Sequence, residues 1–385
     1  MSLRSAESGL ALSSSGVLGW WSTGIQALLA LLLMLVAGSA AEADMSKTIE
    51  WDKSTLVLVH KGGSYARMIR LAGGDILCCF EDQTQVKVRR STDNGRTWKQ
   101  PILVAEAPSG TASNPEMLQL ANGWVLFFYS ERPTDGIHHF TIQVSMSKDS
   151  GRTWRHHSLA YSADVVAGNG CWEPAAIQLT TDEVQLFFAN ENPYRDSNEQ
   201  EITLLRSFDN GRSWWRPETV SFRAGHRDGM PAPLVLRNGK GIVVAIEDNG
   251  YSQMYHPMII HTTLQDNWTQ RFASGASPRR WRAINKPISR EWGGAPYIRQ
   301  MPSGETVVSF QSSVGRDWPQ MVVYVGDENA RNFGGRTVPF KVPLGKGGWW
   351  NSLFVKDDRT ITAISSCNGG VWAIDGHIVT TEAAE

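Results

Sequence analysis

The sequence predicts an all-β fold, a six-bladed β-propeller built from four-stranded antiparallel blades. Three observations support this prediction. A short turn motif recurs at spacings of 56 and 60 residues, which is about the length of chain that a four-stranded blade occupies. An apolar hairpin pattern occurs six times along the chain, and a third apolar segment follows each copy.

The turn motif reads "STDNGRTW" at Ser91–Trp98, and it returns as "SKDSGRTW" at Ser147–Trp154 and "SFDNGRSW" at Ser207–Trp214. Its Ser and Asp side chains can hydrogen-bond the turn backbone, its Gly supplies a positive φ, and its Trp can pack beneath. A degraded copy, "TTLQDNWTQ", occupies Thr262–Gln270. The motif falls between the third and fourth strands of a blade, so we expect it to stabilise the fold on the face opposite the functional site.

Six hairpins match six blades. Each copy is an apolar strand, a turn rich in Gly or Asp, and a second apolar strand. The copies begin at Ala66, Pro115, Pro174, Pro231, Pro296 and Trp350. Third strands such as "VKVRRS", "TIQVSMS" and "ITLLRS" follow, and the chain ends soon after the sixth of them.

The sixth blade therefore lacks its last strand. The apolar segment "TLVLVH" at Thr55–His60 can supply it and close the ring, which removes an open sheet edge. No linker-like or low-complexity segment interrupts residues 50–380. We therefore expect residues 45–385 to form a single propeller domain.

Residues 1–44 differ from the rest of the chain. Arg4 precedes an apolar run, "IQALLALLLMLV", and the small-residue stretch "AGSAAEA" follows it. This pattern is typical of a signal peptide, and we expect cleavage between Ala40 and Ala43 and a secreted or periplasmic protein. The alternative is an uncleaved segment that anchors the protein in the membrane, because apolar character extends back towards Leu18.

Composition narrows the range of partners. The formal net charge is −1, so no overall attraction to nucleic acid or to an anionic membrane is expected. The 16 tryptophans provide flat faces that can stack on sugars. The four cysteines show no metal-ligand spacing, and we expect no metal, no cofactor, and a monomer that binds an oligosaccharide or polysaccharide.

The functional side chains should lie just before and just after each hairpin, on the face opposite the turn motif. Acids, arginines and aromatic residues gather at these positions, among them the strand-end residues Asp82, Glu131 and Arg132. Such a set suits a saccharide, because carboxylates perform glycosidic chemistry, Arg and Asn bind hydroxyl or carboxylate groups, and Trp covers the apolar face of a sugar. The predicted substrate-binding residues are Arg67, Asn114, Trp172, Glu191, Arg227, Asp228, Arg290, Trp292, Tyr297 and Trp350. The alternative for Arg67 is a salt bridge to a neighbouring blade, and for the three tryptophans it is packing in the wall.

Glu173 and Glu247 are the predicted catalytic pair. Glu173 directly precedes the innermost strand of blade 3, and Glu247 ends the second strand of blade 4, so both lie on one face of adjacent blades. A pair of carboxylates can share the work of nucleophile and proton donor in glycoside hydrolysis. Because Asp82, Glu131 and Glu191 occupy similar strand ends in other blades, an acid at Glu247 can also be a feature of the repeat.

The turn motif and its spacing resemble the Asp-box, or BNR repeat, of the sialidase-like six-bladed propellers. The resemblance to sialidases themselves implies an arginine triad, with Arg67 in "YARMIRL" and Arg227, Arg290 and Arg316 as its candidates, and Tyr297 as nucleophile. The Ile-Pro expected after the first arginine is Met68-Ile69 here. An exo-α-sialidase is therefore the second hypothesis.

The hairpin "SYARMIRLAGGDIL" looks like the first blade of the exo-1,5-α-L-arabinanase family, which also has six Asp-box blades. This resemblance implies a retaining, exo-acting glycosidase that uses two glutamates, with Glu173 as nucleophile and Glu247 as acid/base, although the two roles could be exchanged. A secreted lectin that binds a glycan without cleaving it is the remaining alternative, since fold alone does not determine function.

Overall fold

The computed structural model describes residues 45–252, 254–284, 292–313, 319–342 and 347–382. Residues 46–381 form one compact unit. The predicted signal peptide, residues 1–44, lies outside the described residues. Among those that are described, the one helical segment is a 3-10 turn, η1 (Ala167–Asn169), and no helix has the length and apolar character needed to cross a membrane.

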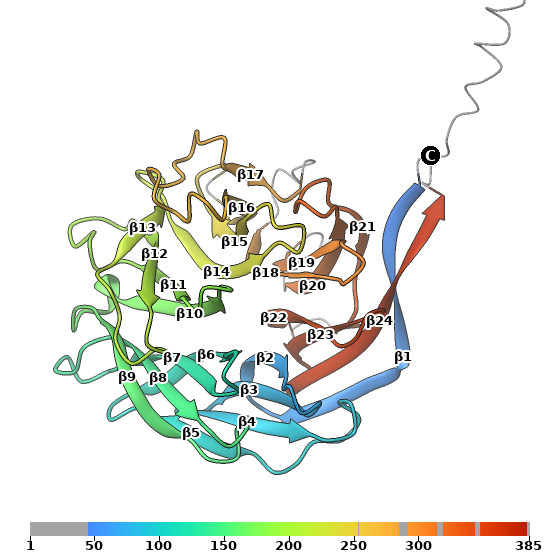
Figure 1. Cartoon of the computed structure of the whole chain (residues 1–385), viewed down its shortest axis with the longest axis horizontal. Coiled ribbons are helices and arrows are strands. Elements are labelled where there is room, and N and C mark those ends of the chain that lie inside the picture. Colours follow the sequence, from blue (N-terminus) through green and yellow to red (C-terminus); the bar gives the residue numbers. More distant parts are fainter. Residues whose placement is uncertain (1–44, 253, 285–291, 314–318, 343–346, 383–385) are drawn as a thin grey trace, which may run out of the picture. The chain divides into compact units, whose positions relative to one another are not determined.

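The described strands form six four-stranded sheets arranged around a common axis, as predicted (Figure 1). Within five of the sheets, strands that are consecutive in the sequence pair as antiparallel neighbours from the axis outwards, and in the sixth the outermost strand is the N-terminal β1. The innermost strands are β2 (Ser64–Arg70), β6 (Thr111–Gln119), β10 (Cys171–Gln178), β14 (Asp228–Val235), β18 (Gly293–Gln300) and β22 (Gly348–Val355). The second strands are β3 (Ile76–Asp82), β7 (Val125–Arg132), β11 (Val184–Asn190), β15 (Ile242–Asp248), β19 (Thr306–Ser312) and β23 (Thr360–Cys367).

The outer half of each blade consists of two further strands. The third strands are β4 (Gln85–Ser91), β8 (Thr141–Ser147), β12 (Glu201–Ser207), β16 (His256–Thr262), β20 (Gln320–Gly326) and β24 (Gly370–Glu382). The outermost strands are β5 (Ile102–Glu106), β9 (Arg155–Ser162), β13 (Glu218–Ser221), β17 (Arg280–Arg282), β21 (Gly334–Thr337) and β1 (Met45–Lys61).

The ring is closed by the N-terminal strand. β1 lies beside β24 and completes the sheet of blade 6, and the Gly62 N–H donates to the Gly369 carbonyl at 2.8 Å where β1 leaves this sheet. The sequence correctly predicts this closure from Thr55–His60, although the strand is longer than that segment. Without β1, the edge of β24 would be left unpaired.

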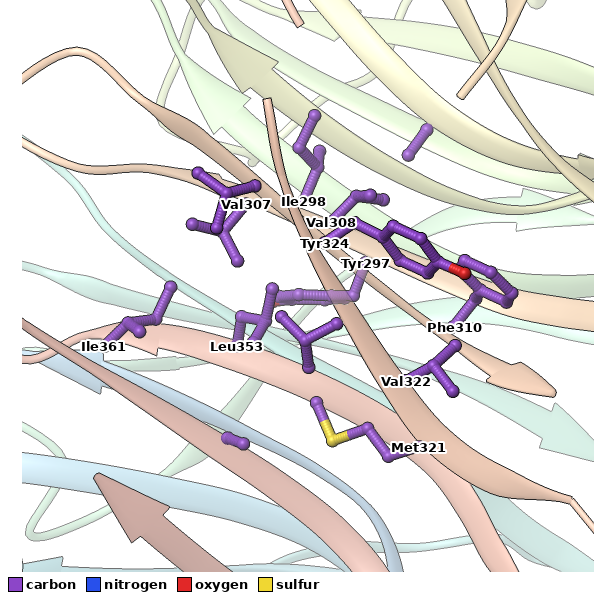
Figure 2. Packing of buried hydrophobic residues seen from close by; sticks show 14 of the residues in the cluster. Tyr297, Ile298, Val307, Val308, Phe310, Met321, Val322, Tyr324, Leu353 and Ile361 are labelled. Atoms are coloured by element: carbon purple, nitrogen blue, oxygen red, sulfur yellow. The ribbon is translucent and has the colours of Figure 1, made fainter. Parts of the chain in front are cut away.

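The core consists of apolar side chains packed between neighbouring blades. In the cluster that spans blades 4 to 6, Val308, Phe310, Val322 and Leu353 are buried side chains from two strands of blade 5, β19 and β20, and from β22 of blade 6 (Figure 2). The second strands are buried on both faces, which explains why they read as nearly continuous apolar runs rather than as alternating patterns. This packing holds the six innermost strands in fixed positions around the axis.

The repeated turn motif lies between the third and outermost strands of blades 1 to 3, at the opposite end of the blade from the start of β2, β6 and β10. In the first copy, Ser91 Oγ donates to Asp93 Oδ1 at 2.7 Å and the Thr97 N–H donates to the same carboxylate at 2.9 Å. The other two copies repeat these bonds. Hydrogen bonds to the Asp93 carboxylate lower its pKa, so the turn is held by an ionised acid.

Candidate functional site

A β-bulge interrupts each of the six innermost strands at the same place. Two residues on the innermost strand have no partner there, and the first of them has a positive φ between 49° and 61° in every blade. These first bulge residues are Tyr65, Asn114, Glu173, Met230, Ala295 and Trp350. A left-handed backbone is uncommon for residues other than glycine, and bulges are enriched beside functional sites, where they redirect side chains.

The bulges also explain why the innermost strands begin earlier than the sequence predicts. Proline follows the first bulge residue in four blades, at Pro115, Pro174, Pro231 and Pro296. Proline usually ends a strand because it cannot donate a ladder hydrogen bond, but within a bulge no such bond is needed. The strands therefore continue two to four residues before the predicted starting points.

Together the six first bulge residues form a layer at the ring axis, which we call the axial floor. Tyr65, Met230 and Ala295 are buried against one another, and Trp350 packs against them. The Tyr65 and Trp350 rings lie 6.0 Å apart, and Tyr65 Oη lies 3.9 Å from Met230 Sδ. Asn114 and Glu173 complete the layer, which is thus apolar on one side and polar on the other.

Side chains from one blade hold the bulge of the next blade. Glu81 Oε2 accepts the Asn114 N–H at 3.1 Å, Glu247 Oε2 accepts the Ala295 N–H at 2.7 Å, and Gln311 Oε1 accepts the Trp350 N–H. Glu81, Glu247 and Gln311 occupy the same register position, opposite the residue that precedes the bulge.

Blades 2 and 6 have Ser130 and Ser366 at this position, and blade 3 has Ala189, whose side chain cannot accept a hydrogen bond. Instead Glu173, from the bulge itself, accepts the Met230 N–H at Oε2 over 3.0 Å. Glu173 thereby takes this role in the seam between blades 3 and 4.

Glu173 and Glu247 approach the same short segment, Gly229–Met230. Glu173 Oε2 bonds the Met230 N–H, and a β-carbon at Gly229 would lie only 3.1 Å from Glu247 Oε1. A larger residue at Gly229 would therefore displace the Glu247 carboxylate. Both glutamate side chains retain partial solvent exposure, so the structure brings the predicted catalytic pair together at a place that a ligand can reach.

The two carboxyl groups differ in their surroundings. Burial and the neighbouring charge of Glu173 raise the pKa of Glu247 to about 8, although the Ala295 N–H opposes the shift. Burial also raises the pKa of Glu173, but the positive charge of Arg132 and the Met230 N–H stabilise its ionised form. A pKa of about 8 favours a proton on Glu247 at neutral pH, while Arg132 and the Met230 N–H are the groups that oppose the rise of the Glu173 pKa.

Arginines flank the pair on both sides. Arg227 donates to Glu191 and Asn198 and contacts Tyr255 Oη at 3.1 Å, and its charge acts on both catalytic candidates. Arg132 donates to Asn114 Oδ1, and its guanidinium lies 4.8 Å from the centre of the Trp172 ring. Glu191, Arg227, Asn114 and Trp172 are therefore grouped around Glu173, as the sequence predicts for a shared site.

Sequence reasoning missed two residues of this group. Arg132 was considered only as a strand-end residue, and it is the charge that acts most strongly on Glu173. Tyr255 follows the second strand of blade 4. Burial and the charges of Glu247 and Glu173 raise the pKa of its phenol, and Arg227 opposes this shift. The signal in the sequence that could have found them is their position, because Arg132 ends β7 and Tyr255 directly precedes β16, both at the end of the blade where the axial floor lies.

Three of the predicted substrate-binding residues lie deeper than expected. Arg67 and Tyr297 are two residues beyond the first bulge residues of their strands, in a buried layer beneath the axial floor. There Tyr297 Oη donates to Glu116 Oε2 at 3.0 Å, and Arg67 Nε lies 3.8 Å from the same oxygen. Asp228 is fully buried and pairs with Arg280 and Ser221, which is a structural network of blade 4.

The remaining predicted residues are aromatic or lie outside the described residues. The Trp292 ring and Glu247 Oε2 both lie within 3 Å of where a β-carbon on Gly294 would be, so this tryptophan is beside Glu247. Trp350 belongs to the axial floor. Arg290 and Arg316 lie outside the described residues. Within the described part of the chain, no group of acids, histidines and cysteines has the geometry of a metal site.

Known structures share this fold. A glutamate-to-alanine mutant of the α-L-arabinofuranosidase arb93a from Fusarium graminearum, in complex with an iminosugar inhibitor, is 18% identical, with a TM-score of 0.67 over 84% of this chain and 97% of that chain. The Penicillium chrysogenum α-L-arabinanase complexed with arabinobiose is 18% identical, with a TM-score of 0.66 and the same coverage. The NanB sialidase from Streptococcus pneumoniae is 11% identical, with a TM-score of 0.56 over 83% of this chain and 70% of that chain.

At these identities the likeness is one of fold. No protein-family model matches the sequence, and a search of the curated proteins found no match. The shared architecture is the six-bladed propeller that arabinanases and a sialidase also adopt. Which reaction the site performs must be argued from its own residues.

Proposed function

We propose that this protein is a glycoside hydrolase that cleaves terminal units from an α-L-arabinan-type polysaccharide with retention of configuration. The observation that carries this proposal is the pair Glu173 and Glu247, which approach one backbone segment from adjacent blades while their surroundings favour different protonation states. Two carboxyl groups, one ionised and one protonated, are what a retaining glycosidase requires.

In the first step, the ionised Glu173 attacks the anomeric carbon while Glu247 donates its proton to the leaving glycosidic oxygen. In the second step, the ionised Glu247 removes a proton from water, the water oxygen attacks the same carbon, and the bond to Glu173 breaks. The second step restores the proton on Glu247 and the free carboxylate of Glu173, so the two glutamates are regenerated in each cycle and the reaction needs no cofactor. Arg132 and the Met230 N–H support this assignment because both stabilise the negative charge that Glu173 must carry.

Two further observations favour a neutral pentose polymer over a sialoside. Arg227, beside the pair, is already engaged by the carboxylate of Glu191, so it is not free for a substrate carboxylate. The phenol that a sialidase would use as its nucleophile is Tyr297, and its hydroxyl is buried between Glu116 and Arg299. The structural neighbours described as an α-L-arabinofuranosidase and an α-L-arabinanase agree with this choice of substrate.

The test is hydrolysis of linear 1,5-α-L-arabinan and of a sialoside by wild type, Glu173→Ala and Glu247→Ala. We expect arabinobiose as the first product of wild type, with no ladder of longer products, and loss of activity in both variants. Proton NMR at early times should show the product with the anomeric configuration of the substrate. Release of sialic acid would instead establish the sialidase, and glycan binding without any product would establish a lectin.

Azide can separate the roles of the two glutamates. With an activated aryl arabinoside, azide can enter the space left by Glu173→Ala and attack directly, which gives a glycosyl azide of inverted configuration. In Glu247→Ala, azide attacks the glycosyl-enzyme instead and gives a glycosyl azide of retained configuration. The opposite pattern would exchange the two roles and leave the class of reaction intact.

A further inference from the structure

A second recess lies on the same face, at the junction where the ring closes between blades 6 and 1. Its cavity volume is about 560 Å³ and it is open to solvent, within the usual range for small-ligand sites. Two adjacent tryptophans, Trp349 and Trp350, lie on one side, and the glycine-rich turns 62–63 and 369–370 form the other. We call it the closure pocket.

The closure pocket is at the level of the catalytic pair. Trp349 and Ser366 are register partners in blade 6, in the same positions that Gly229 and Glu247 occupy in blade 4. Trp350 is the first bulge residue of its blade, as Glu173 is of blade 3. Since the ring has six blades, the seam between blades 6 and 1 lies across the axis from the seam between blades 3 and 4 (Figure 1).

The axial floor connects the two places. Trp350 packs on Tyr65, Tyr65 Oη reaches Met230 Sδ, and the Met230 N–H bonds Glu173. Three packed side chains therefore connect the catalytic glutamate to the closure pocket, and two of them, Tyr65 and Met230, are buried.

The lining of the closure pocket indicates what kind of ligand fits. Among the described residues no charged side chain lines it, and its polar side-chain groups are the indole N–H groups of the two tryptophans, the hydroxyls of Ser64 and Ser366 and the thiol of Cys367. Within the described residues, Ser366 Oγ is buried and has no hydrogen-bond partner, so a hydroxyl group from a ligand would satisfy it. The pocket at the other end of the same seam differs, because Asp52, Arg96 and Lys356 line it.

We propose that the closure pocket binds distal sugar units of the same neutral polysaccharide, with a pyranose or furanose ring stacked on Trp349. This proposal rests on the proposed function for the identity of the glycan, but the pocket's aromatic, uncharged lining supports it independently. Sugars present an apolar ring face and several hydroxyl groups, and this lining offers partners for both. The pocket would make affinity depend on chain length.

The test measures binding rather than turnover. In a Glu173→Gln background, calorimetry gives the affinity for linear α-1,5-arabino-oligosaccharides of two to six units. We expect affinity to rise with length, and Trp349→Ala to remove the rise, weakening the longest ligand by about tenfold while changing the disaccharide little. Trp349→Phe should restore part of the effect, since it keeps a flat ring. Trp215→Ala is the matched control, because Trp215 is 63% exposed and lies near the outer edge of blade 3.

The outcomes separate this proposal from the proposed function. If wild type hydrolyses arabinan but affinity does not depend on length, or Trp349→Ala weakens all lengths equally, the closure pocket proposal is wrong. The same holds if none of the oligosaccharides binds. If wild type hydrolyses nothing while Trp349→Ala still abolishes the length dependence, the pocket binds the glycan and the proposed hydrolysis is wrong.

Discussion

Glu81 in blade 1 and Glu247 in blade 4 occupy the same position of the repeat, yet their surroundings differ. Each lies opposite the residue before a bulge, and each accepts the N–H of the next blade's first bulge residue. Glu81 is also bound by Ser64 Oγ at 2.5 Å. Glu247 instead lies against Gly229 and feels the charge of Glu173.

The comparison separates a structural task from a chemical one. Holding the bulge needs only an acceptor atom, and Gln311 performs it in blade 5 with an amide. Chemistry at Glu247 depends on a second carboxyl group nearby, that of Glu173, which is present in the seam between blades 3 and 4 because Ala189 leaves the Met230 N–H to it. Glu247 shares its position in the repeat with Glu81, and it becomes a candidate catalyst because Glu173, which is not repeated among the first bulge residues, lies nearby.

The strongest test of this comparison replaces the carboxylate by an amide at both positions, Glu247 and Glu81. Glu247→Gln keeps the acceptor for the Ala295 N–H but cannot donate an acidic proton, so we expect kcat/KM on an arabino-oligosaccharide to fall by about 10²–10⁴-fold. Glu81→Gln should retain most of the activity. Comparable losses in both variants would mean that the bulge bond, rather than acid catalysis, limits the rate.

The pH dependence of the same two proteins sharpens the result. Activity requires a protonated Glu247, so the wild-type profile should fall as pH rises through the pKa of about 8. Glu81→Gln should keep this basic limb. The residual activity of Glu247→Gln should lack it, and a basic limb that persists there would have to belong to another group.

A smaller effect is expected from Arg132, which distinguishes the environment of Glu173 from that of Glu247. Its charge is the largest that lowers the pKa of Glu173, so Arg132→Ala should raise that pKa and move the acidic limb of the profile to higher pH. One unit of movement corresponds to about a tenfold loss at low pH. Arg132→Lys should restore part of the shift because it keeps the charge.

Arg152→Ala is the control for this experiment. Arg152 is an exposed residue of the second turn motif, on the opposite face of the ring, and its loss should leave both limbs in place. An acidic limb that does not move in Arg132→Ala would show that Arg132 only supports Asn114 and Trp172.

The sequence predicted the fold because the relevant signals are periodic. Six hairpins, three copies of one turn and an unmatched N-terminal strand specify six blades and their closure, and β1 confirms the last of these. The same reasoning led to Glu173 and Glu247 as neighbours on adjacent blades. Their contacts with Gly229–Met230 bear this out as geometry.

The sequence could not predict the bulges or what lies beneath them. Nothing in "GNGCWEPAAIQL" indicates that Glu173 adopts a left-handed backbone, because the pattern of apolar residues continues through it. Tyr297 and Arg67 read as residues at the mouth of the site, but the two residues that each bulge inserts move them one layer down. The sequence placed Arg132 at a strand end on this face, but its action on Glu173 depends on how blades 2 and 3 pack, which the sequence does not show.

The smallest expected effect concerns stability and returns to Glu81 and Glu247. Between the ordinary glutamate pKa and about 8, the folded protein holds a proton on Glu247 that the unfolded chain has lost. The folded state binds more protons in this window, so the free energy of unfolding decreases as pH rises through it. Glu247→Gln removes that ionisation. We therefore expect it to unfold at a higher temperature than wild type at pH 8, by about 2 °C for a domain of this size, with the difference shrinking at pH 5.

Thermal unfolding of Glu81→Gln under the same conditions measures what an amide costs as the acceptor of a bulge N–H. If Glu247→Gln raises the unfolding temperature more than Glu81→Gln does, and this difference depends on pH, the extra stability comes from removing the interaction between Glu247 and Glu173. If Glu247→Gln is no more stable than Glu81→Gln at pH 8, then Glu247 is not held protonated at the expense of folding. In that case its proton would be less available to a leaving group than the geometry implies, because the same burial and the same neighbouring charge produce both effects.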